Sequence, residues 1–242
     1  MTYRVDPARH DHGRRYQYAM VAGLKRHGIK EGEALTITWG HRYPPEGQHL
    51  VMEQGYLGNR LEWCSLGFNG LNGRATFPKA PDGERFNDLF PGVMRSWKDK
   101  PGYALVIGQC PGDAALAGTN IDNWVATITD SVPDTKYRPH PSVTAPAASL
   151  DDDLSGARCC ITYNSNAGVM AVMAGVPTIT MDRGAMAWNV SSHNPQFSLM
   201  TDRDEWAHDM AYSQWTLQEI EQGIAWEHLQ PVWESINVSD CA

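Results

Sequence analysis

The fold is decided by residues 159–181, which read CCITYNSNAGVMAVMAGVPTITM. The apolar run at 159–163 predicts a buried strand, and residues 167–174 predict a helix that Gly175 ends. Residues 176–181 then predict the next strand, because they are again largely apolar. A strand, a helix and a second strand in this order predict two parallel strands with a helix packed on the sheet.

The same alternation extends upstream of this segment. Residues 103–108 predict a buried strand that ends in glycine, and residues 121–129 predict a helix. Residues 137–141 are expected to form an extended loop, because a residue that precedes proline is pushed out of the α region. Residues 149–153 are expected to begin a short helix. These elements predict a lobe with a parallel sheet, whose ligands bind beyond the carboxyl ends of the strands.

The N-terminal part of the chain predicts a second lobe of the same kind. Residues 11–28 have apolar side chains at helical spacing, and residues 35–39 and 49–52 predict strands that run into loops. Such strand-then-loop units are typical of a Rossmann-like lobe. Residues 65–83 are rich in Gly and Asn and predict turns. The polar segment 97–102 is expected to link the lobes.

The expected fold class is therefore α/β, with two Rossmann-like lobes built on parallel sheets. Residues 1–100 are expected to form the N-terminal lobe and residues 101–242 the C-terminal lobe, which ends in a helical tail. Two helical stretches are expected over residues 203–236, where four tryptophans are spread along the chain.

The composition limits the class of protein. No apolar run among the 242 residues approaches the roughly 20 residues of a membrane span, and the N-terminus carries no signal-peptide pattern, so a cytoplasmic protein is expected. The formal charge of −8 argues against tight passive binding to nucleic acid. Five cysteines without CxxC spacing favour neither a disulfide framework nor a zinc site. No metal site is expected at Asp151–Asp153 either, because acidic residues suit the first turn of a helix.

The strand end at Asn164-Ser165-Asn166 is the first candidate binding site. It opens a helix that contains Gly168, and free backbone N–H groups at a helix start can hold a phosphate. Ser165 and Asn166 can add side-chain hydrogen bonds. The alternative is ordinary helix capping by Ser or Asn.

A second candidate is the loop that contains Arg138 and His140. Two prolines hold His140 on a stiff loop, where an imidazole can bond a phosphate or ribose or act as acid and base. The planar guanidinium of Arg138 matches phosphate oxygens. The alternative is a surface histidine without a role.

Two further segments follow predicted strands. Gly108 and Gln109 end the first strand of the C-terminal lobe and permit close backbone approach, although the segment lacks the G-x-G-x-x-G pattern of dinucleotide sites. A plain turn is the alternative. Glu53 ends a strand of the N-terminal lobe, where a carboxylate that faces the other lobe could act as base or acid on an acceptor hydroxyl. For Glu53 the alternative is a helix cap or a salt bridge.

Taken together, these segments resemble the retaining Kdo transferases of bacterial capsule biosynthesis and, more loosely, other GT-B glycosyltransferases. Order and spacing agree over about residues 50–182. The segments that carry the resemblance are Glu53-Gln54-Gly55-Tyr56, Gly108-Gln109 with Asp113, Arg138-Pro139-His140-Pro141, Asn164-Ser165-Asn166-Ala167-Gly168, and Gly175-Val176-Pro177.

The resemblance implies a GT-B fold, a nucleotide-sugar bound by the C-terminal lobe and an acceptor bound by the N-terminal lobe. His140 and Ser165 would touch the phosphate or ribose, Glu53, His140 and Asp113 would be catalytic, and no metal or other cofactor would be needed. GT-B tails cross back to the first lobe, so the residues after 203 could do so here.

The chain departs from the family pattern at Asn69 and Asn72. The capsule enzymes carry an Asp in the matching stretch, close to the reacting sugar. The segments around Glu53 and Asn69 also resemble small phage proteins, and phage GT-B enzymes modify hydroxymethylated pyrimidines in DNA. The acceptor is therefore expected to be a glycan or a modified DNA base. Two alternatives are a nucleotide-sugar epimerase or hydrolase and a non-catalytic nucleotide-binding protein on the same fold.

Overall fold

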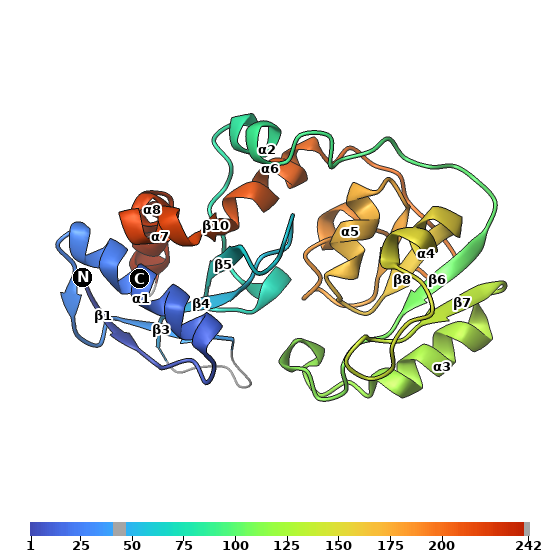
Figure 1. Ribbon diagram of the computed structural model, residues 1–242, viewed down its shortest axis with the longest axis horizontal. Coiled ribbons are helices and arrows are strands. Elements are labelled where there is room, and N and C mark those ends of the chain that lie inside the picture. The colour runs from blue at the N-terminus through green and yellow to red at the C-terminus, as the bar shows by residue number, and fades with distance from the viewer. Residues whose placement is uncertain (41–46, 240–242) are drawn as a thin grey trace. The chain divides into compact units, whose positions relative to one another are not determined.

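A computed structural model describes residues 1–40 and 47–239 of the chain. It divides into two compact units (Figure 1). The first unit consists of Met1–Leu89 together with the tail from Ala207, and the second consists of Phe90–Trp206. The sequence predicted a single boundary near residue 100, with the tail assigned to the C-terminal lobe. The tail instead belongs to the first unit, because its strand and helices complete the sheet and the core of that unit.

The first unit is built on a six-stranded sheet with the order β10-β5-β4-β3-β1-β2. Its strands are β1 (Thr2–Val5), β2 (Lys30–Glu31), β3 (Leu35–Trp39), β4 (His49–Gln54), β5 (Trp63–Phe68) and β10 (Gln214–Thr216). The strands β1 to β4 are parallel, whereas β5 is antiparallel to both of its neighbours. The predicted strands at 35–39 and 49–52 are confirmed, but the sheet is mixed rather than wholly parallel.

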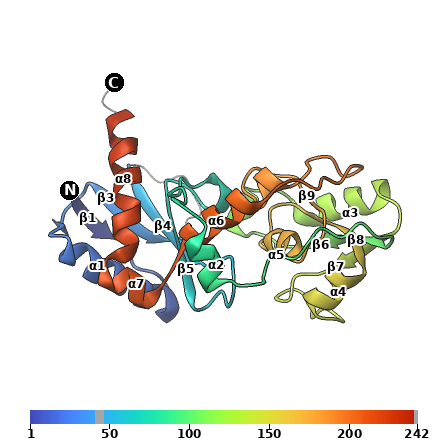
Figure 2. The same cartoon turned by 90° about the horizontal axis from the view of Figure 1, so that it is seen from above.

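Helices cover one face of this sheet. The helices and the short 3-10 turn of this unit are α1 (Asp11–Arg26), η1 (Asn72–Arg74), α2 (Glu84–Leu89), α7 (Leu217–Gln222) and α8 (Ile224–Ser239), and α6 (Asp204–Tyr212) begins in the second unit and ends in the first. Alternate strand residues such as Ile37 and Leu50 share a core with Met20 of α1 and with Trp226 and Leu229 of α8. Figure 2 shows α7 beside α1, in agreement with their contacts. The tail therefore carries much of the apolar surface that buries the first sheet.

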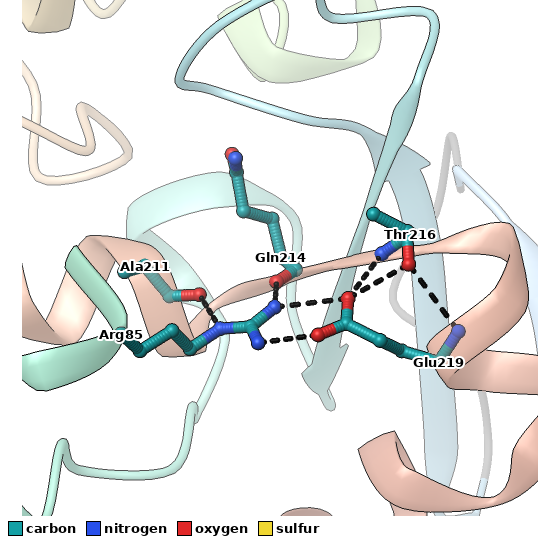
Figure 3. A network of polar contacts seen from close by, with 5 residues as sticks. All are labelled: Arg85, Ala211, Gln214, Thr216 and Glu219. Carbon is teal, nitrogen blue, oxygen red and sulfur yellow. Dashed lines mark hydrogen bonds and ion pairs between the residues drawn. The ribbon is translucent and has the colours of Figure 1, made fainter. Parts of the chain in front are cut away.

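A polar network ties the tail to α2 (Figure 3). Nε of Arg85 donates to the Ala211 carbonyl over 2.8 Å, and Nη2 donates to the Gln214 carbonyl over 3.1 Å. The same guanidinium forms a two-pronged ion pair with Glu219. Glu219 also accepts from Thr216 in a capping box that begins α7. Residues 134 positions apart are joined in this way, so the network fixes the tail against the rest of the first unit.

The Gly- and Asn-rich stretch after residue 65 is not made of turns alone. Ser65–Phe68 belongs to β5, where a Cβ on Gly67 would lie 2.6 Å from the Cβ of Ala75, so the glycine allows close packing. The turns come next: Asn69 and Asn72 both adopt left-handed φ values, 57° and 53°. The sequence reading missed the strand because glycine signals a turn and a close approach alike.

The second unit is built on a four-stranded, wholly parallel sheet with the order β7-β6-β8-β9. Its strands are β6 (Tyr103–Ile107), β7 (Thr135–Arg138), β8 (Ala157–Thr162) and β9 (Thr178–Thr180). The helices are α3 (Ile121–Ser131), α4 (Leu150–Gly156) and α5 (Ala167–Met173), with short turns η2 (Ala114–Leu116) and η3 (Trp188–Val190). The predicted extended loop at 137–141 is therefore wrong in part, because Tyr137 and Arg138 end a strand.

The sheet of the second unit is covered on both faces. Cys159 and Ile161 pack with Ile128 of α3 on one face, while Cys160 packs with Leu154 of α4 and Ala171 of α5 on the other. This arrangement is visible in Figure 1. The two adjacent cysteines are therefore buried strand residues that point to opposite faces, as period-2 alternation requires.

The two units repeat one strand order. The parallel strands of the first unit lie in the order β2-β1-β3-β4, and those of the second unit in the order β7-β6-β8-β9. In each unit the chain first moves to one side of its starting strand and then crosses to the other. The crossing creates a switch point between β1 and β3 and another between β6 and β8, and ligands of open parallel sheets bind at such points.

Within the described ranges, no helix combines the length and the apolar character that crossing a membrane requires.

Candidate functional site

The carboxyl ends of all four strands of the second sheet lie at one level. Ile107 pairs with Arg138 of β7 and with Thr162 of β8, and Thr162 pairs with Thr180 of β9. The loops after these strands therefore begin side by side, at what we call the carboxyl edge. The residues predicted for ligand binding follow three of the strands: Gly108 and Gln109, His140, and Asn164 to Gly168. The structure thus brings residues from distant parts of the sequence to one edge.

Gln109 and Asn164 join the two loops at the switch point. Nε2 of Gln109 donates to Oδ1 of Asn164 over 2.8 Å, and the backbone N–H of Asn164 donates to Oε1 of Gln109 over 3.0 Å. Both side chains are buried. Because their amides are used inside the protein, the two residues position the loops after β6 and β8.

The network continues to the loop after β9. Nδ2 of Asn164 donates to the Ala115 carbonyl over 2.7 Å and to Oδ1 of Asp182 over 2.8 Å. The same Asp182 oxygen accepts from the Gly184 N–H over 2.8 Å. Asn164 therefore links three consecutive loops of the carboxyl edge. The sequence reading did not single out Asp182, although its place directly after a predicted strand was a usable signal.

Arg138 lies at this edge but is engaged within the protein. Nη1 donates to the Ala148 carbonyl over 2.7 Å and pairs with Oδ2 of Asp153, whose side chain is only 4% exposed. Lys136 pairs with the other carboxylate oxygen. Burial alone would raise the pKa of Asp153, but hydrogen bonds from Lys136 and Arg138 hold it below its ordinary value. The third residue of the Asp triplet therefore belongs to a structural ion-pair cluster.

His140 offers an open hydrogen-bond donor. Its Nδ1 accepts from the Ser142 N–H over 3.2 Å, so the proton of the neutral ring is on Nε2. Its carbonyl accepts from Val143 and Thr144, which closes a turn around the ring. Among the residues that the structure describes, none accepts a hydrogen bond from Nε2. The ring is half-buried, and its orientation is fixed by this loop.

Ser165 offers a second donor, directly after Asn164. Its backbone N–H donates to Oγ1 of Thr162, and its Oγ accepts from the Ala167 N–H over 3.2 Å. The hydroxyl proton finds no acceptor among the described residues. Asn166 begins α5 without a side-chain cap, and a Cβ on Gly168 would lie 3.1 Å from Cγ2 of Thr162. Gly168 thus permits close packing of α5 on β8, and its contact with a ligand stays a prediction.

Gly108 and Asp113 have local structural tasks. A Cβ on Gly108 would lie 2.6 Å from the hydroxyl of Tyr137, so the glycine makes room for that ring. Asp113 is exposed, and its Oδ1 accepts from the Ala115 N–H at the start of η2. A catalytic role of Asp113 stays a prediction.

Glu53 lies near the end of β4 in the first unit and is half-buried. Its Oε1 accepts from the Gln54 N–H over 2.9 Å. The rest of the motif is structural, because Tyr56 is buried and its hydroxyl accepts from Ser65 and donates to Asn72. Burial raises the pKa of Tyr56, which keeps the phenol neutral. Glu53 is thus the member of this motif that keeps a partly exposed acidic group.

No group of three or more His, Cys, Asp or Glu side chains gathers in the described part of the chain in a way that could hold a metal ion.

The fold is shared with solved glycosyltransferases. The structure resembles a Thermosulfurimonas dismutans KpsC β-Kdo 2,7 transferase, with 12% identity and a TM-score of 0.53 over 93% of this chain and 98% of that chain. It also resembles a Thermosulfurimonas dismutans KpsC β-Kdo 2,4 transferase, with 11% identity and a TM-score of 0.55 over 88% of this chain and 91% of that chain. No family model and no curated protein matches the chain.

These likenesses confirm the expected fold class. Two Rossmann-like α/β lobes recur in the Kdo transferases, as the resemblance implied. At such low identity the likeness concerns the fold alone, and the roles of single residues have to be argued from the site.

Proposed function

We propose that the chain is a glycosyltransferase whose second unit binds the phosphate of a nucleotide-sugar at the carboxyl edge. The observation that carries the proposal is the pair of open donors, Nε2–H of His140 and the hydroxyl of Ser165, on loops beside a topological switch point. Phosphate oxygens accept hydrogen bonds from such groups. The fold shared with Kdo transferases supports the same reaction class.

The proposed chemistry is transfer of the sugar to an acceptor hydroxyl. The acceptor oxygen forms a bond to the anomeric carbon, the bond from that carbon to the phosphate oxygen breaks, and Glu53 accepts the acceptor's proton. Negative charge grows on the leaving phosphate, and fixed donors such as His140 and Ser165 stabilise it there. Asn164 and Gln109 position the loops, and Arg138 holds β7 to α4 through Asp153.

The first experiment is a thermal-shift screen of the purified chain against CMP, UDP, GDP, ADP and their sugar derivatives. One nucleotide family should stabilise the protein, by about 2.7 kcal/mol at a ligand concentration a hundredfold above the dissociation constant. Ser165→Ala should weaken this response. Ser131→Ala is the matched control, because Ser131 is exposed and its hydroxyl donates to the Ile128 carbonyl within α3. No response to any nucleotide would contradict the proposal.

Turnover of the selected donor then tests the chemistry. Glu53→Gln should lower transfer strongly with little change in donor affinity, whereas Glu62→Gln, an exposed carboxylate of the same unit, should behave like the wild type. Products formed without acceptor would favour an epimerase or hydrolase. Binding without turnover in the presence of either acceptor class would favour a non-catalytic nucleotide-binding protein.

Two acceptor classes belong to the proposal, a glycan hydroxyl and the hydroxymethyl group of a modified pyrimidine in DNA. The formal charge of −8 favours the glycan, because DNA binding draws on cationic side chains. Transfer assays with both acceptors side by side decide between them.

A further inference from the structure

A cation at the carboxyl edge of the second unit would strengthen phosphate binding, because charge-assisted hydrogen bonds are about twice as strong as neutral ones. Arg138, which the sequence suggested for this task, pairs through Nη1 with a nearly buried carboxylate. Freeing it would leave Asp153 without one of its two partners. The phosphate charge therefore calls for another side chain at the same edge.

We infer that Arg183 is the phosphate-binding cation of this site, an inference that rests on the proposed function. Arg183 lies in the loop directly after β9, at the carboxyl edge. Its side chain is exposed, and no described residue pairs with its guanidinium. A planar guanidinium presents parallel N–H groups that match two oxygens of a phosphate.

The backbone around Arg183 is held in place from the switch point. The N–H groups of Met181 and Asp182 both donate to the Tyr163 carbonyl, over 3.0 and 3.1 Å. Oδ1 of Asp182, the residue before Arg183, accepts from Nδ2 of Asn164. The same oxygen accepts from the backbone N–H of Gly184, the residue after Arg183. The loop that carries the guanidinium is thus anchored although the side chain is free.

The same anchor connects Arg183 to the proposed donors. Ser165 directly follows Asn164, and Arg183 directly follows Asp182, so each flanks one member of a hydrogen-bonded pair. A phosphate near the Ser165 hydroxyl would therefore lie within the region that a long side chain from position 183 can sample. The Asn164–Asp182 bond fixes the separation of the two loops, which is what a specific phosphate site requires.

Arg95 offers a matched control in the same unit. It is also an exposed arginine, but its backbone bonds to the C-terminal end of α5 through Met173, at the opposite end of the sheet. Arg183→Met and Arg95→Met remove the same charge and the same number of donors. Both variants should fold, because neither guanidinium has a partner among the described residues; thermal unfolding without ligand checks this.

The experiment compares nucleotides with nucleosides by calorimetric titration of the wild type, Arg183→Met, Arg183→Lys and Arg95→Met. The probes are CMP, UDP, GDP and ADP, the corresponding nucleosides, and inorganic pyrophosphate. Arg183→Met should weaken nucleotide and pyrophosphate binding by about 10- to 100-fold and leave nucleoside binding unchanged. Arg183→Lys should restore part of the loss, and Arg95→Met should stay within about twofold of the wild type.

The other outcomes distinguish failure of this inference from failure of the proposed function. If the wild type binds a nucleotide and Arg183→Met binds it equally well, the inference is wrong and the proposed function stands. An equal loss of nucleoside and nucleotide affinity also overturns the inference, because it indicates a change of the loop rather than loss of a phosphate contact. If the wild type binds none of the nucleotides, the proposed function itself fails, and the inference with it.

Discussion

The guanidinium of Arg138 and the carboxylate of Asp153 form an ion pair in which the two side chains are only 12% and 4% exposed. The pair joins the end of β7, where the loop that carries His140 begins, to α4. It gives a structural reason for two features of the sequence, the arginine before Pro139 and the third residue of the acidic triplet. The stability of the second unit should depend on it.

Replacement of Asp153 by Asn should destabilise the second unit strongly. The substitution leaves the nearly buried Arg138 without a counter-charge, and breaking a buried pair in this way costs about 3–5 kcal/mol. Asp151→Asn is the control, because Asp151 is exposed at the same helix start and its loss should cost less than about 0.5 kcal/mol. Urea unfolding of both variants measures the difference; equal stabilities would contradict the structural role of the pair.

The Arg85–Glu219 pair should make the first unit sensitive to acid. Burial alone would raise the pKa of Glu219, but hydrogen bonds from Arg85 and Thr216 hold it below its ordinary value of 4.5. A lowered pKa in the folded state adds stability above the pKa of the unfolded chain, and this stability is lost as the pH falls through the folded value.

At pH 7, Glu219→Gln should therefore lower the free energy of unfolding by about 1.5–3 kcal/mol. The gap to the wild type should close as the pH falls through the lowered pKa that Glu219 has in the folded state. Glu221→Gln, an exposed neighbour on α7, should track the wild type at every pH. Urea unfolding between pH 3 and 7 follows all three proteins, and a gap that is independent of pH would refute the linkage.

Asn164→Asp should place two carboxylates side by side at the switch point. Nδ2 of Asn164 now donates to Asp182 over 2.8 Å, and two like charges at that distance cannot both ionise easily. One of the two groups should take a raised pKa in the folded state, so the variant should be destabilised at pH 7 and recover as the pH falls toward 4. Thermal unfolding of the variant as a function of pH measures this change in stability. Asn123→Asp is the control, because Asn123 is exposed on α3.

Gly175→Ala should be much more harmful than Gly112→Ala. Both glycines have left-handed φ values, +75° and +79°, so both substitutions carry a backbone cost of about 1–2 kcal/mol. Only at Gly175 would the added Cβ also meet a neighbour, the Ser96 carbonyl at 2.0 Å, which adds about 1–3 kcal/mol. Differential scanning calorimetry compares the two variants, and similar midpoints would argue against the close packing of α5 on residues 95–98.

Sequence periodicity predicted much of the fold correctly. The helix at 11–28, the strands at 35–39 and 103–108, and the strand–helix–strand segment after residue 159 all appear within a few residues of their predicted bounds. These elements are buried on one or both faces, so their apolar patterns are strong. The edge strands β2, β7 and β10 were missed, since short edge strands bury few side chains and carry little pattern.

The candidate site was predictable as a location but less so as a set of contacts. Strand ends followed by polar residues indicated the carboxyl edge, and His140 and Ser165 lie there with open donors. The tasks of Gln109, Asn164 and Arg138 depend on partners 15 to 55 residues away. No local sequence pattern predicts such partners, because only the folded sheet brings them together.

The return of the tail to the first unit reverses the usual order of completion on the ribosome. Domains generally fold as units with the N-terminal one first. Here the second unit, residues 90–206, is fully synthesised before β10 exists to pair with β5, and before Trp215 and Trp226 exist to enter the first core. Until then β5 is an unpaired edge, the kind of surface on which nascent chains associate wrongly. The part of this protein that is made first is therefore the part that is finished last.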